Sequence, residues 1–364
     1  MMIRYRHIAA VCSLLYSFQA QAGVNIAVIA PQDSTSIGYD IVTGAEVAVE
    51  EINKNGGLNG EKVNLIKIDD ACQDSLSLSA AQMLALNKEN KTALTIGPYC
   101  PNQFSNIAKT FADANIMQIV PVAVYRADSE HKVDSLITLP FHKEMLAQTF
   151  FDYMQENFPD YSCAVIFDAK NASIAEATRE VFAKHNQADK LFSYTFEDND
   201  FDYDKISELA FNNQVNAALI LSDAEHAGRM TEEFRAHQRD YPIFTDEYQV
   251  MPDFQSVLGD LIEDTYFLEL PSLKDNPDFA ESLVNLRLSG VELQGLAVYG
   301  YSAVRLWAKT AEKAKSFDSS KIADTLKTAP VKNDWSYQIF FNTPNKLVHY
   351  DIVQYKDGEY TQVY

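Results

Sequence analysis

Few side chains in this 364-residue sequence have the type and spacing that a catalytic or metal site requires. The patterns H-E-x-x-H, G-x-S-x-G, the phosphate-binding loop and G-x-G-x-x-G are absent, and the histidines show no metal-ligand spacing. One acidic run, Asp198-x-Asp200-x-Asp202, begins like a calcium loop. It has Tyr203 where that loop needs glycine and Leu209 where it needs glutamate. We interpret the run as a solvated acidic loop, and we expect neither an enzyme nor a bound metal or cofactor.

Two other acids, Asp223 and Glu247, each follow a short apolar run that is typical of a buried strand. Loops at strand ends are enriched in functional side chains. If both carboxylates face one cleft, they favour a cationic or amine-bearing ligand, because a buried charge needs a partner. Alternatively, both are solvated loop acids in a very acidic chain. The sequence leaves these two interpretations open.

The scaffold for such loops is an alternation of short apolar runs with longer helical patterns, which predicts βαβ units and a doubly wound parallel sheet. A second round of the same alternation is expected to begin at Thr138 to Phe141. Strands are expected at 24–30, 63–68, 94–97, 116–120, 163–168, 192–196, 216–221, 243–245, 266–270, 338–341, 349–355 and 359–364. Helices are expected at about 80–86, 103–114, 146–157, 174–185, 206–212, 279–288, 293–313 and 320–327.

The stretch that ends at Cys100 has the clearest local signals. Thr43 and Glu46 form a T-x-x-E pattern, which predicts a helix start with a capping box. Gly56-Gly57 can adopt the left-handed conformation that ends a helix. Cys72 and Cys100 lie just past consecutive predicted strands, so we expect both at the same edge of a parallel sheet.

Residues 1–22 have the features of a secretory signal peptide. Arg4 and Arg6 precede an apolar run that is too short to span a membrane, and Ala20-Gln21-Ala22 is a small-x-small cleavage site. The mature chain is therefore expected to begin at Gly23. No later segment is long and apolar enough to cross a bilayer, so we expect an exported, soluble protein.

Charge and length narrow the function classes further. Without residues 1–22, 28 basic residues face 51 acidic ones, a net charge of −23. So acidic a surface argues against nucleic acid and anionic membranes as partners. Cys163 lies in an apolar run and indicates a buried inert thiol rather than a nucleophile. The chain is longer than a domain with a single hydrophobic core usually is, so we expect two domains.

The stretch from Ser36 to Cys100 resembles the type I periplasmic binding proteins of the leucine/isoleucine/valine-binding family. The matching segments are the T-G-A-E helix start, the N-G-G-L-N-G turn, the D-D-A-C loop and the I-G-x-x-C loop, in order and spacing. The matches continue through most of the mature chain. The resemblance implies a disulfide between Cys72 and Cys100.

The same resemblance implies two doubly wound α/β lobes joined by a three-segment hinge. We expect one lobe to comprise 23–139 and 271–345, and the other 140–270 and 346–364. The crossings would lie near Leu139-Pro140, Leu270-Pro271 and Asn345-Lys346. Ligands of open α/β sheets bind outside the carboxyl ends of the strands, so hinge closure would enclose a solute between the two loop edges. The candidate ligand-binding residues in these loops are Ile37, Tyr99, Pro101, Asn102, Gln103, Val122, Val124, Tyr125, Asn171, Asp223 and Glu247.

Several positions depart from the family pattern for free α-amino acids. Pro101 stands where Ser usually helps to hold the ligand carboxylate, although Asn102 can still donate hydrogen bonds. Val124 stands where a Thr hydroxyl usually receives the ligand ammonium. On the other lobe, Ala172 and Asp223 align with aromatic family positions, whereas Glu247 aligns with the acid that binds the ammonium.

The resemblance therefore implies a periplasmic substrate-binding protein of an ABC importer, acting as a monomer and presenting its closed form to a membrane permease. The ligand would be an amino acid, amine, amide or related small polar compound, with branched-chain amino acids disfavoured. The alternative function is a sensory module that reports the ligand to a membrane receptor.

Overall fold

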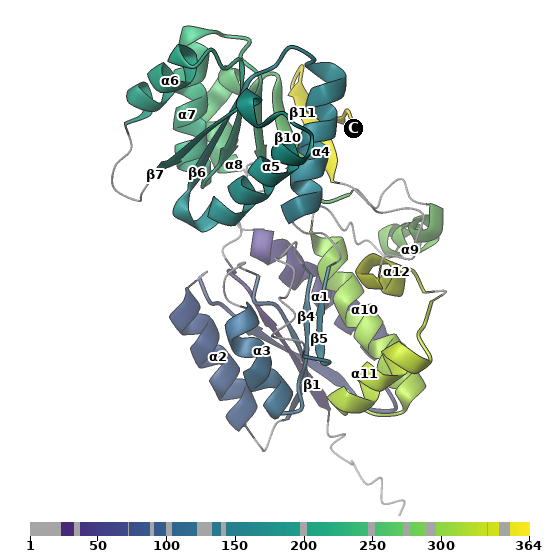
Figure 1. Ribbon diagram of the computed structural model, residues 1–364. Coiled ribbons are helices and arrows are strands. Elements are labelled where there is room, and N and C mark those ends of the chain that lie inside the picture. Colours follow the sequence, from purple (N-terminus) through teal and green to yellow (C-terminus); the bar gives the residue numbers. More distant parts are fainter. Residues whose placement is uncertain are drawn as a thin grey trace, which may run out of the picture.

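The computed structural model describes residues 23–32, 37–71, 73–87, 91–99, 104–121, 133–139, 143–196, 202–246, 252–271, 277–288, 296–332, 334–341 and 350–364. These residues form two α/β lobes, each built on one sheet (Figure 1). The expected fold class is therefore confirmed. The expected signal peptide, residues 1–22, lies outside the described residues.

The first lobe is built on a five-stranded parallel sheet in the order β2-β1-β3-β4-β5. The strands are β1 (Val24–Ile29), β2 (Val63–Ile68), β3 (Thr92–Ile96), β4 (Met117–Val120) and β5 (Leu136–Thr138), and the helices that connect the first four are α1 (Ile37–Lys54), α2 (Asp74–Leu86) and α3 (Phe104–Asp113). Thr138 pairs with Val120 in this sheet. The sequence predicted that the second round of alternation begins at Thr138. It begins after β5 instead.

The second lobe is built on a seven-stranded sheet in the order β12-β11-β10-β9-β8-β6-β7, in which only β11 and β12 run antiparallel to their neighbours. Its strands are β6 (Cys163–Asp168), β7 (Leu191–Phe196), β8 (Ala217–Leu221), β9 (Ile243–Asp246), β10 (Thr265–Glu269), β11 (Asp351–Lys356) and β12 (Glu359–Gln362). Its helices are α4 (Lys143–Asn157), α5 (Ala172–Lys184), α6 (Tyr203–Asn212), α7 (Ala224–His237) and α8 (Pro252–Leu258), with short 3-10 turns at Ala169–Asn171, Ala188–Lys190 and Gly259–Ile262.

Between β10 and β11 the chain returns to the first lobe. It forms α9 (Pro277–Leu288), α10 (Ala297–Ala314), α11 (Ser319–Thr328) and α12 (Trp335–Phe341) there. α10 packs along α1, and α11 and α12 pack on α10. The chain thus passes between the lobes three times, as the family resemblance implies. The proposed crossing residues Pro140, Asn345 and Lys346 lie outside the described residues, so the domain bounds stay predictions.

The first sheet is covered by helices on both faces, because successive side chains of a strand point to opposite sides. Ile26 and Val28 of β1 belong to the core that contains residues of α1 and α10. Ala27 and Ile29 belong to a separate core with residues of α2 and α3. This alternation produces the doubly wound lobe that the βαβ pattern predicts (Figure 1).

The capping box predicted at Thr43 and Glu46 is wrong. α1 already begins at Ile37, and Thr43 Oγ1 donates to the carbonyl oxygen of Tyr39, 3.0 Å away, within the helix. Glu46 Oε1 instead pairs with Lys67 Nζ on β2 at 2.6 Å. The important residue of this T-G-A-E segment is Gly44, which lies where α1 meets α10.

The strand predicted at 338–341 is also wrong, because these residues belong to helix α12. The β-branched and aromatic composition favours a strand locally. Tertiary packing overrides that preference, since Trp335, Ser336, Ile339 and Phe340 are buried at helical spacing. Asp334 also caps the helix start, because its Oδ1 accepts from the Ser336 backbone N–H at 3.0 Å.

Candidate functional site

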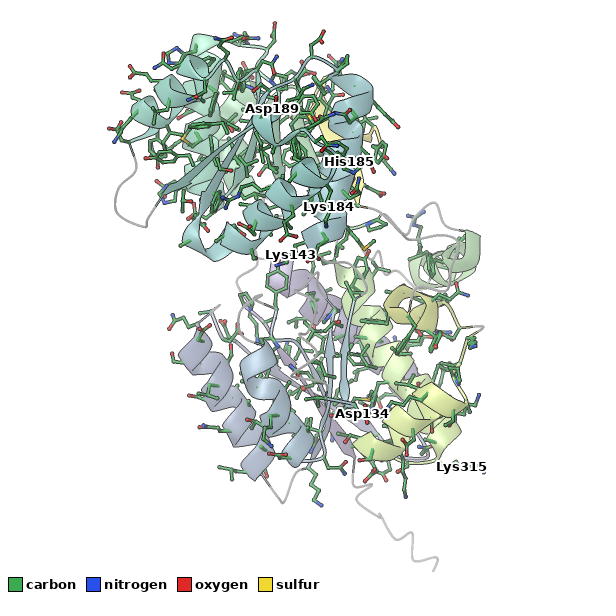
Figure 2. All side chains as sticks on the ribbon, viewed as in Figure 1. Asp134, Lys143, Lys184, His185, Asp189 and Lys315 are labelled. Atoms are coloured by element: carbon green, nitrogen blue, oxygen red, sulfur yellow. The ribbon has the colours of Figure 1, made fainter. Side chains whose placement is uncertain are left out.

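The carboxyl ends of the parallel strands in the two lobes face each other. In Figure 2, Asp134, just before β5, lies in the half of the first lobe away from the second lobe, and Lys143, at the start of α4, lies at the junction. Asp189, just before β7, lies on the side of the second lobe away from the first (Figure 2). β5 and β7 therefore run toward the junction, and their parallel neighbours run with them. The loops at these ends are the ones that sequence reasoning selected.

At the second-lobe edge, Asp168 and Asn171 hold the ends of β6 and β8 together. Asp168 Oδ1 accepts from the backbone N–H of Asn171 at 3.0 Å and from its Nδ2 at 3.1 Å. Asn171 Nδ2 also donates to the carbonyl oxygen of Leu221 at 3.3 Å. Both amide hydrogens of Asn171 are thus used within the lobe, so Oδ1 is the polar atom that it can offer to a ligand.

Ser222 extends the same network by one residue past β8. Its hydroxyl donates to Asp168 Oδ2 at 3.4 Å, and its side chain is buried. The Asp168 carboxyl group thus receives hydrogen bonds at both oxygens. This arrangement fixes the position of the Asp168 carboxyl group at the carboxyl end of β6.

Asp223 follows directly and is the N-terminal cap of α7. Its Oδ1 accepts from the backbone N–H of His226 at 3.0 Å, while 59% of its side chain remains exposed. His226 is held in turn by Tyr203, whose hydroxyl lies 2.6 Å from His226 Nδ1. Burial raises the pKa of Tyr203, so this hydroxyl stays protonated. The structure thus places the Asp223 carboxylate at the expected strand end, partly open to solvent.

Asp246 is a third acid at this edge, in a loop that the sequence selected, although it was not among the predicted ligand-binding residues. It is the last residue of β9, it is only 3% exposed, and β9 lies next to β8 in the sheet. Asp168, Asp223 and Asp246 therefore occupy the ends of three adjacent strands. The available signal was an aspartate that closes a buried apolar strand, as in Cys163–Asp168 and Ile243–Asp246.

At the first-lobe edge, Tyr99 follows β3 and is 5% exposed. The preceding loop is tightly placed, because Gln118 Nε2 donates to the Gly97 carbonyl oxygen at 3.0 Å. Gly97 has a φ of +94°, and a Cβ there would lie 2.2 Å from the carbonyl oxygen of Ile29. Glycine is thus required for β1 and β3 to present their loops together. Ile37 opens α1 at the same edge.

Many predicted site residues lie outside the described residues and stay predictions. These are Pro101, Asn102, Gln103, Val122, Val124, Tyr125 and Glu247, together with both cysteines of the expected disulfide, Cys72 and Cys100. Ala172 is described, and it begins α5 as an exposed residue. Cys163 is buried and free, which confirms the prediction of a buried thiol, and burial raises the pKa of this thiol.

Within the part of the chain that the structure describes, no three or more His, Cys, Asp or Glu side chains are grouped so that they could hold a metal ion. Among the same residues, no helix combines the length and apolarity needed to cross a bilayer.

The known proteins that are similar to this chain in sequence are described as binding proteins. A family model described as "Periplasmic binding protein" matches residues 23–202. An amino acid binding protein of Pseudomonas aeruginosa is 24% identical, with 95% of this chain and 94% of that protein covered. A Leu/Ile/Val-binding protein homolog of Brucella suis is also 24% identical, with 84% and 81% covered.

Solved structures share the fold at lower identity. A leucine-binding protein of Thermotoga maritima superposes with a TM-score of 0.73 at 17% identity, covering 94% of this chain and 98% of that one. A branched-chain amino acid transporter substrate-binding protein of Streptococcus pneumoniae, solved with isoleucine, gives a TM-score of 0.74 at 18% identity, with 93% and 97% covered.

Proposed function

The chain belongs to the type I periplasmic binding proteins, in the group related to Leu/Ile/Val-binding proteins, and from this premise we propose that it delivers a small polar solute to an ABC importer. Members of this family bind solutes and do not catalyse reactions. In the proposed mechanism, the solute binds between the lobes in the periplasm, the hinge closes, and the closed form docks on a membrane permease. The protein acts as a monomer in this cycle.

The observation that carries the proposal is the opposition of two strand-end edges across the lobe junction (Figure 2). Open α/β sheets bind ligands outside the carboxyl ends of their strands. Because the chain links the lobes by three segments, the lobes can open and close about a common hinge. Closure is then favoured by a ligand that contacts both edges, since only the closed state forms all of these contacts.

For the ligand, we propose an amino acid or another small compound with a basic amine. Asp223 offers a partly exposed carboxylate, and the buried Asp168 and Asp246 end the neighbouring strands β6 and β9. An ammonium group is the natural complement of this edge. Relatives named as amino acid or Leu/Ile/Val-binding proteins support the amine. Pro101 and Val124 replace the hydroxyl-bearing residues of the family pattern, so the carboxylate side is proposed to differ from that of branched-chain binders.

A ligand panel tests this proposal. Thermal unfolding is measured with amino acids, primary amines, amides and short carboxylates, and each hit is followed by small-angle scattering. We expect a raised midpoint and a smaller radius of gyration with amine-bearing compounds, because the ligand stabilises the closed state. Hits confined to carboxylates without an amine would reject the ligand class. A midpoint shift without compaction would reject enclosure between the lobes.

Transport is tested separately in the source organism. Deletion of the gene should abolish uptake of the compound identified by the panel, and a copy with the binding site intact should restore it. Unchanged uptake together with a lost chemotactic or transcriptional response would instead support the sensory alternative.

A further inference from the structure

A second candidate binding site lies in the first lobe, away from the strand-end edges. α1 and α10 line an open cavity of about 170 Å³, between the C-terminal half of α1 and residues 301–312 of α10. The two helices run in the same direction, since Gly44 meets Ala297 near their starts and Asn59 Nδ2 reaches the Ala311 carbonyl oxygen near their ends. The cavity has an apolar floor that includes Ala48, Ile52 and Ala308.

Side chains of both charges line this cavity. The acids are Glu51 and Glu312, and the bases are Arg305 and Lys309. On α10, Arg305, Lys309 and Glu312 are three or four residues apart, so they lie on one face of the helix. Lys309 Nζ lies 3.7 Å from Glu312 Oε2, and these side chains are 44% and 50% exposed. They form the outer rim of the cavity.

The inner wall is held in place by contacts among its own residues and with Trp335 and Asp334 behind it. The Tyr301 hydroxyl donates to the Glu51 carboxylate, and the Tyr301 ring stacks on Trp335 with centroids 5.8 Å apart. Arg305 lies 5.5 Å from the centre of the Trp335 ring, and its Nη2 donates to Asp334 at 3.2 Å. Burial, and then Glu51, raise the pKa of Tyr301, so the phenol remains a neutral donor. The wall is therefore preorganised, and a solute would not have to order it.

The balance of charges decides what kind of solute fits. The four charged lining residues sum to zero, and Asp334, behind the wall, is paired with Arg305. A simple cation or anion therefore meets attraction from one pair of lining residues and repulsion from the other. A dipolar solute can place its anionic group near Arg305 and Lys309 and its cationic group near Glu51. Each of these would be a charge-assisted hydrogen bond, which is stronger than a neutral one.

We propose that the α1–α10 cavity binds a small zwitterion, a solute with one carboxylate and one ammonium group, independently of the site between the lobes. The proposal rests on the cavity, its two pairs of opposite charges and its preorganised inner wall. It would remain valid if the interlobe ligand proved to be of another class.

Tryptophan fluorescence gives a local readout. The chain has two tryptophans. Trp335 backs the inner wall, and Trp307 lies on α10, fully buried against Phe317. The probes are γ-aminobutyrate, butyrate and butylamine, which share a carbon chain and carry both charges or one. We expect a saturable change with γ-aminobutyrate, and binding at least about tenfold weaker for either singly charged probe, the loss expected for one charged hydrogen bond.

Variants locate the response. Lys309→Met should weaken γ-aminobutyrate binding about tenfold, because it removes one charged contact without disturbing the core. Lys54→Met is the matched control: Lys54 is 77% exposed on α1, pairs with Glu50, and does not line the cavity. Asp223→Asn should leave this signal unchanged. Three results would overturn the proposal: no saturable change, butyrate or butylamine binding as tightly as γ-aminobutyrate, or equal responses in the two lysine variants.

Discussion

Gly44 of α1 lies directly against Ala297 of α10, so that a Cβ atom at Gly44 would be 1.8 Å from the Ala297 carbonyl oxygen. Gly300 mirrors it, since a Cβ there would be 2.2 Å from the carbonyl oxygen of Ile41. The two helices therefore approach to backbone contact, although 250 residues separate Glu51 and Tyr301, which also join them. This contact attaches the returning segment of the chain to the first lobe.

Gly44→Ala should therefore separate α1 from α10. We expect the free energy of unfolding to fall by about 1–3 kcal/mol, the usual cost of overpacking, measured by urea denaturation. Gly228→Ala in α7 is the matched control, because its new Cβ would meet only side-chain atoms of Val257. Both variants gain helix propensity of about 1 kcal/mol, so the difference between their losses reports the backbone clash at Gly44. Equal losses in both variants would contradict the role given to Gly44.

Asp223→Asn tests the charge of the second-lobe edge. Asparagine caps a helix as well as aspartate does, so α7 should keep its stability while the edge loses one negative charge. We expect the dissociation constant of an amine-bearing ligand to rise roughly two- to fivefold, as for a partly exposed ion pair. The measurement is isothermal titration with the hit from the ligand panel.

The matched control for Asp223→Asn is Asp318→Asn, which removes the same charge from the cap of α11 in the other lobe. Its ligand affinity should equal that of the unmodified protein. An equal loss in both variants would mean that net charge, and not the strand-end edge, attracts the ligand.

Arg235 is a buried cation that holds the turn before β10. It is 5% exposed, and its Nη1 donates to the carbonyl oxygens of Leu261 and Glu263. Burial lowers the pKa of its guanidinium to about 10. Arg235→Met should lower the unfolding free energy by about 2–4 kcal/mol, because two carbonyl groups lose their donor. Arg229→Met, which breaks the exposed pair with Glu225, should cost less than about 1 kcal/mol. A ranking in the opposite order would refute this account.

Asp318 makes the free energy of unfolding depend on pH. The hydrogen bond from the Lys321 backbone N–H, aided by Asn115, holds the pKa of this carboxyl below its ordinary value. A carboxyl whose pKa is lowered by folding stabilises the protein above its unfolded pKa of about 4, and this contribution disappears as the pH falls through the folded value.

The stability difference between the unmodified protein and Asp318→Asn should therefore shrink between neutral pH and about pH 3, because the unfolded carboxyl is largely protonated there and the contribution is lost as the pH falls toward the lowered folded pKa. Urea denaturation at the two pH values measures it. Asp324→Asn, which removes a carboxylate from the same helix, is measured alongside as the comparison for the lost charge. A difference that stays constant with pH would contradict the assignment.

The sequence predicted the elements whose local pattern and tertiary role agree. The strands at Val63–Ile68 and Cys163–Asp168 were predicted with the bounds that the structure shows. The prediction failed at 338–341, where strand-forming residues are held in α12 by burial of Trp335 and Phe340. The intrinsic preference of a residue for helix or strand contributes tenths of a kcal/mol to the free energy of folding, whereas burying one aromatic side chain contributes about 2 kcal/mol.

The site was predictable only in outline. Strand ends identify candidate loops, which is how Asn171 and Asp223 were selected. Their partners depend on which strands are neighbours: Asn171 reaches Leu221 because β6 lies beside β8, 50 residues later in the chain. Sheet order is a tertiary property, so the contact of Asp168 with Ser222 could not be derived from spacing along the chain.

The position of β11 and β12 has a consequence for biosynthesis. β10 pairs with β11, and α1 packs on α10, so each lobe is completed by residues near the C-terminus. A chain that lacks the segments after β10 leaves one edge of the second sheet and one face of α1 in the first lobe uncovered. A premature stop codon just before Asp351 would remove β11 and leave β10 as an open, aggregation-prone edge strand.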